Sequence, residues 1–265
     1  MSNVQINPFD GELAIANSNY CRFANGLLIH AGETGGEPSK ATQFVHHQLR
    51  DMFLAPEFSC PGARAAINNG TYRFSLYKSL GSPESTEGLC RDLHFFVGEQ
   101  DAMKSNYTTF AACFMGPHPS SQEHFRDMLW EQLQLLHDRD AEFHCYDTTV
   151  SNDPMDPRFA FSFAGRAFFI AGMNPASQRM IRKFAYPTLV FNARRQFQHL
   201  TDTGKMPHFQ SVVRGNEIEL QGTLNPNLDP FGNVPEPPQY AGVPKNEQIP
   251  WKCPFHPHQI ADEGE

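Results

Sequence analysis

The chain has 265 residues, 40% of them hydrophobic, which allows one large domain or two small ones. Its net charge of -8 and pI near 5.8 argue against a nucleic-acid backbone as the main partner and favour a soluble enzyme with a cationic substrate. No run approaches about eighteen apolar residues, and the N-terminus lacks the basic start and apolar core of a signal peptide. The sequence therefore predicts a cytoplasmic protein without a membrane span.

The cysteines are scattered and form no C-x-x-C pair, which disfavours a zinc ribbon, a thioredoxin-type site and a disulfide framework. The 23 Phe residues fit a roomy apolar interior, and the 12 His residues make a metal or haem site worth seeking. The six cysteines are Cys21, Cys60, Cys90, Cys113, Cys145 and Cys253.

The first elements are predicted from residues that typically start or end helices and loops. Residues 1–38 show little periodicity and end in a run rich in Gly and Glu, which predicts an arm or loop. Ser39 is the predicted cap of the next helix. The apolar positions assigned to that helix are Phe44, Leu49, Met52, Phe53 and Leu54.

A short helix with unusual punctuation follows. Pro61 suits the first helical position, and Asn69-Gly70 supplies a left-handed stop, which leaves Cys60 at the N-cap. There the free N–H groups and the helix dipole favour a thiolate, which can ligate a metal or a haem iron or act as a nucleophile. The structural alternative is a small buried cysteine beside a tight turn, and these residues alone favour it.

Helices and short strands then alternate. Residues 72–77 fit a short strand or a helical turn, and Ser82 opens a helix that runs to about Val97. Ser120 and Glu123 form a capping box for the strongest helix, which carries Phe125, Leu129, Leu133 and Leu136 on one face. Further strands are predicted at 107–115 and 188–191, a hairpin at 159–171, a short basic helix near 179–183 and a helix at 193–200.

Beyond Gly222 the chain is rich in Pro, Asn and Gly, which predicts a long irregular tail that wraps the domain. The fold class that follows is α+β. Residues 39–265 form a single domain in which helices cover a small, mostly antiparallel sheet.

Titratable groups gather between residues 137 and 147. His137 lies at the edge of an apolar helix face, where a histidine can be an axial haem ligand, a metal ligand, a general base or a satisfied core residue. It cannot share one metal with His144, because residues seven apart on a helix lie about 10 Å from each other. Asp140, Asp147 and Asp153 suit either a cationic substrate or ordinary turn and cap roles.

Three arginines are candidates for carboxylate binding, including the propionates of a haem. They are Arg64, Arg179 and Arg182, and for Arg182 a solvated surface position is favoured. No Walker loop, GxGxxG, G-x-S-x-G or H-E-x-x-H motif occurs, which removes nucleotide-dependent and common hydrolase functions.

Several motifs in one order resemble the YqcI/YcgG family from about Phe44 to Phe255. Members include the haem-dependent N-hydroxylases of guanitoxin and D-cycloserine biosynthesis, which oxidise a guanidine nitrogen of arginine or an arginine-derived substrate. The motifs are Cys60-x-Gly62-Ala63-Arg64-Ala65-Ala66, Leu136-His137-x-x-Asp140, Asp153-Pro154, Phe161-Ser162-Phe163, Asn174-Pro175 with Arg179, Thr188-Leu189-Val190-Phe191-Asn192 with Gln196-Phe197, Leu220-Gln221-Gly222 with Asn225-Pro226, Gln239-Tyr240-x-Gly242 and Trp251-x-Cys253-Pro254-Phe255.

The resemblance implies haem b, O₂ or peroxide as oxidant, and a small cationic substrate. Cys60 is the first choice for the iron ligand and His137 the alternative; in the first case His137 and Asp140 are the catalytic residues of the distal pocket. An electron-donor protein and a homodimer stay open, and no nucleic acid or membrane is expected. The propionate partners are then Arg64 and Arg179, and the substrate-binding residues are Asp140, Asp147, Glu236 and Tyr240.

Two alternatives belong to other functional classes. The chain has Asn174, Arg194 and Val243 where motifs of the resembling family usually carry His, His and Arg, which favours a protein that binds haem or another small ligand without turnover. A cofactor-free hydrolase that uses Cys60 and His137 is the third interpretation.

Overall fold

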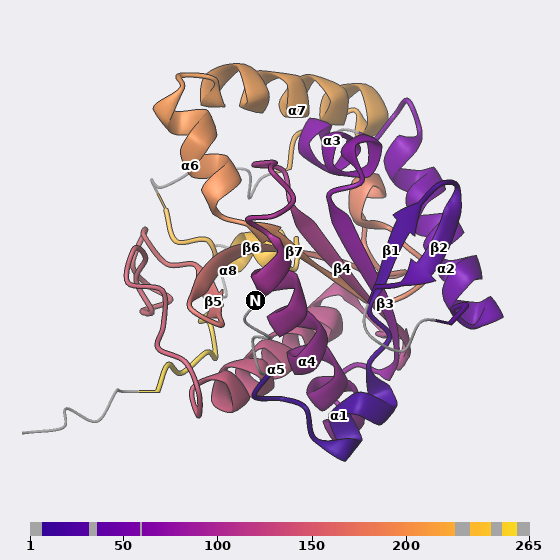
Figure 1. Ribbon diagram of the computed structural model, residues 1–265. Helices are drawn as coiled ribbons and strands as arrows, with labels where there is room; N and C mark the ends of the chain where they lie inside the picture. Colours follow the sequence, from indigo (N-terminus) through magenta and orange to yellow (C-terminus); the bar gives the residue numbers. More distant parts are fainter. Residues whose placement is uncertain (1–6, 32–35, 59, 226–233, 245–250, 259–265) are drawn as a thin grey trace, which may run out of the picture.

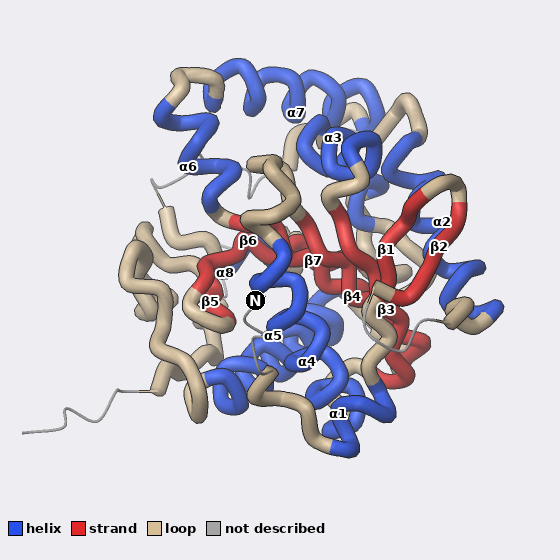
Figure 2. The backbone as a smooth tube through the Cα atoms, in the orientation of Figure 1, coloured by secondary structure: helices blue, strands red, loops and turns tan. Residues whose placement is uncertain are grey.

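A computed structural model of the chain describes residues 7–31, 36–58, 60–225, 234–244 and 251–258. Seven strands in this part of the chain form one sheet in the order β2-β1-β3-β4-β7-β6-β5 (Figures 1 and 2). The strands are β1 (Cys21–Ala24), β2 (Leu27–His30), β3 (Tyr72–Ser79), β4 (Thr109–Gly116), β5 (Phe161–Phe163), β6 (Arg166–Met173) and β7 (Thr188–Ala193). Only β3 and β4 pair in parallel, so the predicted α+β fold with a mostly antiparallel sheet is confirmed.

Helices cover both faces of the sheet, as Figure 1 shows. On one face, α4 (Pro83–Glu99) crosses from β3 to β4, α5 (Gln122–Asp140) packs beside it, and α1 (Glu12–Asn17) packs on α4. We name this side the framework face. On the other face lie α2 (Lys40–Leu54), α3 (Pro61–Asn69), α6 (Arg195–Asp202) and α7 (Met206–Gln221), and we name it the cavity face.

The alternation of side chains along β4 explains why the sheet is buried on both sides. Phe110, Ala112 and Phe114 belong to the core of the framework face, whereas Ala111 and Cys113 belong to the core of the cavity face. All five are at most 1% exposed. A strand with two buried faces reads as a continuous apolar run, which is why this segment predicted a strand so clearly.

Two helix caps were predicted with different success. The Ser39 side chain accepts a hydrogen bond from the Thr42 N–H, so the predicted cap of α2 is confirmed. The cap of α5 is Ser121, not Ser120, because Ser121 has extended backbone angles and accepts from the His124 N–H. Phe44, one of the apolar positions from which this helix was predicted, is 56% exposed on α2 and does not join the core.

Residues 1–38 are more structured than the predicted arm or loop. Their described part contains α1 and the hairpin β1–β2, which extends the sheet beside β3. The hairpin turns through Asn25 and Gly26, both with positive φ (53° and 81°), which is the geometry that favours an Asn-Gly turn.

The C-terminal third also differs from the prediction. Helix α7 was not predicted, and the short helix α8 (Pro237–Tyr240) lies within the predicted irregular tail. The basic segment near 179–183 is a 3-10 helix, η1 (Met180–Arg182). The parts of the tail at 226–233, 245–250 and 259–265 lie outside the described residues. None of the described helices has the length and apolar character required to cross a membrane.

Candidate functional site

A cavity opens on the cavity face, between strands β6 and β7 and the helices α3, α6 and α7. The volume of the cavity is about 210 Å³. That volume exceeds the roughly 150 Å³ of a cavity that binds benzene but lies below the roughly 300–1,000 Å³ of drug-sized ligand pockets. Its aromatic walls come from Phe53, Phe58, Phe169, Phe197 and Phe209.

Cys60 lies on the wall of this cavity, at the N-terminal end of α3. Pro61 at the start of the helix and the left-handed Gly70 at its end (φ 66°) confirm the predicted punctuation. Burial raises the pKa of the Cys60 thiol, while the N–H groups of Ala63 and Gly62 and the charge of Arg182 act to lower it. The Cys60 side chain forms no helix-cap hydrogen bond.

Two carboxylates line the cavity, and each is held by an arginine. The Glu236 side chain pairs with Arg194 and accepts a 3.2 Å hydrogen bond from the Tyr240 hydroxyl. Burial raises the pKa of Glu236 to about 7, against the charge of Arg194. Glu217 pairs with Arg179 at 2.6 Å, and both side chains are less than 10% exposed.

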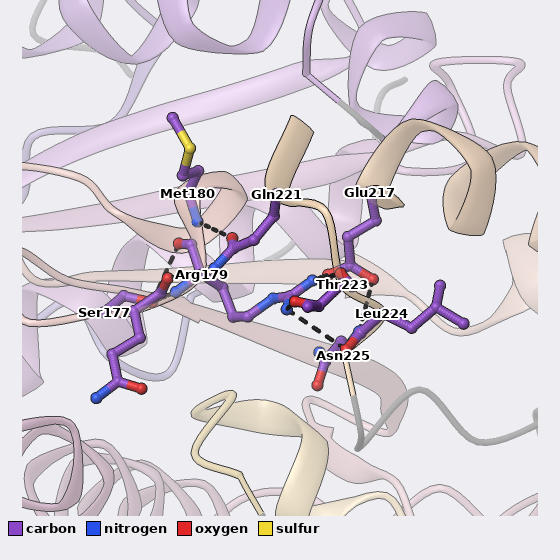
Figure 3. A network of polar contacts seen from close by, with 9 residues as sticks. Ser177, Arg179, Met180, Glu217, Gln221, Thr223, Leu224 and Asn225 are labelled. Carbon is purple, nitrogen blue, oxygen red and sulfur yellow. Dashed lines mark hydrogen bonds and ion pairs between the residues drawn. The ribbon is translucent and has the colours of Figure 1, made fainter. Parts of the chain in front are cut away.

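The Arg179–Glu217 pair belongs to a network that fastens the end of α7 to η1 (Figure 3). Arg179 also donates to the Thr223 carbonyl at 2.7 Å. The Gln221 side chain accepts from the Met180 N–H at 2.8 Å and donates to the Gln178 carbonyl at 2.6 Å. We name Arg179, Glu217 and Gln221 the η1–α7 latch.

The predicted propionate partners do not face the cavity. Arg64 donates to the carbonyl oxygens of Ala55, Pro56 and Phe58 at 2.7–3.1 Å, which ties the end of α2 to α3. Arg179 is taken up by the latch. The structure therefore gives both arginines structural contacts in place of the predicted role.

His137 lies on the framework face, away from Cys60. Its Nε2 accepts from the His258 N–H at 2.9 Å, and its ring packs 5.0 Å from the ring of Phe255. Burial, followed by the charge of His258, lowers the pKa of His137 to about 4. Because Phe255 belongs to the framework core and Cys60 packs against the cavity-face core, the two residues cannot act as a nucleophile–base pair.

The other predicted polar residues also lie outside the cavity. Asp140 accepts from the Ala164 N–H and from His144 Nδ1, and burial raises its pKa to about 6. Asp147 accepts from the Ala167 N–H at 2.9 Å. The Tyr240 hydroxyl lies in the core, where the Phe161 N–H donates to it. Of the predicted site residues, only Cys60 and Glu236 line the cavity.

Sequence reasoning missed the remaining polar lining. Arg182, favoured as a surface residue, lines the cavity together with the amides of Asn192, Gln196, Gln210 and Gln239. The Arg182 side chain donates to the carbonyl oxygens of Gly172 and Tyr240, contacts that no local pattern predicts. Among the described residues, no group of three His, Cys, Asp or Glu side chains is placed to hold a metal ion.

Comparison with known proteins places these residues in a family. The family model described as YqcI/YcgG matches residues 49–256. The chain belongs to the YqcI/YcgG family. It is 22% identical over 204 residues to a YqcI/YcgG relative, the uncharacterized protein YqcI of Bacillus subtilis (strain 168), with 75% of each chain covered. No solved structure matches significantly. Every residue that lines the cavity falls inside the family match.

Proposed function

We propose that this protein is a haem-dependent N-oxygenase that hydroxylates a guanidine or amine nitrogen of a small, arginine-like cation in specialised metabolism, with Cys60 as the iron ligand. The observation that carries the proposal is the position of Cys60, on an apolar cavity wall at a helix N-terminus. A thiolate ligand donates electron density that favours O–O cleavage, which an unreactive guanidine nitrogen requires.

The residues that line the cavity are chemically suited to haem b, but the cavity itself is small. The aromatic lining matches the flat apolar face of a porphyrin, and the N–H groups of Gly62 and Ala63 favour the ionised sulfur that binds iron. The cavity of about 210 Å³ is too small for a whole porphyrin, so the proposal requires α7 to move outward. Only Met206 and Glu217 of α7 are buried, so an outward movement of α7 exposes little apolar surface.

A bound haem would supply the oxidising power, and the residues of the chain would bind and orient the substrate. Glu236 and Glu217 are the carboxylates of the cavity lining, and a cationic nitrogen would bind one of them by replacing its arginine partner. Because its pKa is near 7, the Glu236 carboxylate can hold or release a proton at neutral pH. One oxygen atom enters the N–H bond. With O₂ the other oxygen would leave as water, a step that consumes two electrons from a donor protein and two protons from solvent; with peroxide no outside electrons are needed.

Reconstitution with haem tests the ligand assignment. We expect the reduced, CO-bound protein to show the red-shifted Soret band of a thiolate complex, and Cys60→Ser to lose it. Cys145→Ser is the matched control, because Cys145 is exposed and does not line the cavity. If Cys60→Ser leaves the spectrum unchanged while His137→Gln alters it, histidine is the ligand, and protein that binds no haem refutes the proposal.

Binding without turnover is the second candidate, and one observation favours it. Both carboxylates of the cavity are already paired with arginines, so a cationic substrate must compete for them. This candidate predicts a coloured protein that consumes neither O₂ nor peroxide when L-arginine is added. The N-oxygenase predicts consumption together with a product 16 Da heavier, detected by mass spectrometry.

A further inference from the structure

Arg182 differs from the other charged residues of the cavity. Glu217 and Glu236 each have an arginine partner that lies outside the lining. Arg182 has only two acceptors among the described residues, the carbonyl oxygens of Gly172 (3.2 Å) and Tyr240 (2.8 Å). Both are held by the same nitrogen, Nη1, and no described carboxylate pairs with the guanidinium. Arg182 is half-buried, and a charge partly removed from water without an ionic partner favours an anionic ligand.

The free edge of this guanidinium has the geometry of a carboxylate site. Nε and Nη2 lie on one edge of the plane, and neither has an acceptor among the described residues. A carboxylate takes two parallel hydrogen bonds from such an edge. The Arg182 side chain is also held in place by Gly242 (φ +71°). The two residues pack so closely that a Cβ atom at position 242 would lie 2.7 Å from Arg182 Cδ.

The nearest ionisable groups do not neutralise Arg182. Glu217 is committed to Arg179, and burial raises the pKa of the Cys60 thiol, which disfavours a negative charge beside Arg182. Burial lowers the pKa of Arg182 to about 10, so the guanidinium stays charged at neutral pH. The cavity wall therefore presents a fixed positive charge beside apolar surface.

We propose that Arg182 is the carboxylate-binding residue of the cavity, and that the natural ligand carries a carboxylate on an apolar or cationic body. Two sources share this chemistry, the carboxylate of an amino-acid substrate and a propionate of the haem. The site lies in the cavity of the proposed function, but it requires only the carboxylate and not the iron.

Two matched ligand pairs test the site and separate the sources. L-arginine and agmatine share the guanidinium and differ in the carboxylate, and calorimetry gives their affinities for the protein as purified and after haem loading. Haem and haem dimethyl ester differ in the free propionates, and absorbance titration gives their affinities. We expect wild-type protein to prefer the carboxylate member of one pair by tenfold or more, and Arg182→Gln to bring that ratio close to one.

Three further variants serve as controls for the role of Arg182. Arg182→Lys keeps the charge without the fork and should retain part of the preference. Gly242→Ala displaces Arg182 and should lower the preference with the charge intact. Arg158→Gln, at an exposed arginine that pairs with Asp156 and does not line the cavity, should leave the preference unchanged. Circular dichroism and thermal unfolding show whether each variant is folded.

The pair that shows the effect identifies the source of the carboxylate. A wild-type protein with no preference in either pair overturns the inference, as does a preference that survives in folded Arg182→Gln. Loss of the proposed function gives a different result, because a protein that binds no haem can still discriminate L-arginine from agmatine through Arg182.

Discussion

The helices on the two faces of the sheet are held by different kinds of contact. On the framework face, α4 and α5 bury Leu89, Leu93, Phe96, Leu129 and Leu133 with no measurable exposure. On the cavity face, α7 buries only Met206 and Glu217, and its hold on the domain includes the polar η1–α7 latch. Apolar packing of the first kind gives one rigid arrangement, whereas a few polar contacts can be exchanged for water or for a ligand.

The same contrast separates predicted residues with structural contacts from residues that line the cavity. His137 and Asp140 stand out in the sequence, yet each satisfies a neighbouring element: His137 accepts from His258, and Asp140 accepts from Ala164 and His144. Cys60 and Arg182, by contrast, line the cavity. The chemistry that a small molecule can reach therefore lies on the face with the looser wall.

The largest expected effect separates the two faces by stability. Trp130 is 1% exposed and stacks on Tyr240 at 5.4 Å in the framework core, so Trp130→Ala should cost about 3–5 kcal/mol. Phe209→Ala should lower the free energy of unfolding by less than about 2 kcal/mol. The Phe209 ring on α7 is only half-buried and is already partly in contact with water. Urea unfolding measures both, and equal losses would mean that the faces are equally well packed.

The second prediction uses pH and concerns the framework face. The folded-state pKa of His137 lies near 4 and its ordinary value is 6.5, so its neutral form stabilises the fold above pH 6.5. That contribution, on the order of 3 kcal/mol at most, is lost as the pH falls from 6.5 towards 4.

We therefore expect His137→Gln to lose less stability than wild type between pH 7 and pH 4.5. Urea unfolding at both pH values measures the difference. The raised pKa of Asp140 acts in the opposite direction over much of the same window, but it is common to both proteins and cancels in the comparison. Identical losses in the two proteins would contradict the structural role of His137.

The sequence predicted the elements whose pattern is strong and local. β4 and α5 have long apolar patterns, and both were found near their predicted positions. The β1–β2 hairpin was missed although Asn25-Gly26 is a typical hairpin turn, because its four-residue strands carry little periodicity. α7 was missed because few of its residues are buried, so it lacks the continuous apolar stripe of a core helix.

The site was predictable only where a single turn defines it. The position of Cys60 at the N-cap follows from Pro61 and Gly70, which are close in the chain. The orientation of Arg182 depends on carbonyl groups 10 and 58 residues away, so no local pattern contains it. Arg64 and Arg179 were predicted to bind the haem propionates, but backbone carbonyls and Glu217 take those guanidinium groups instead.

The last prediction concerns the latch and has the smallest global effect. Glu217→Gln removes the charge that faces Arg179, whose side chain is 7% exposed. If α7 stayed in place, the unpaired charge would cost about 3–5 kcal/mol. Because α7 is weakly buried, we expect it to open and hydrate Arg179, which limits the global loss to about 1–2 kcal/mol.

Hydrogen exchange distinguishes local opening from global destabilisation. In Glu217→Gln, amides of residues 206–221 should exchange faster while those of α4 and α5 keep their protection. Glu219→Gln is the matched control, since Glu219 is exposed on the same helix. Faster exchange in both layers would mean that the latch supports the whole fold. Faster exchange in α7 alone means that the cavity has a wall that can open while the framework face stays intact, which is what a buried ligand needs in order to enter.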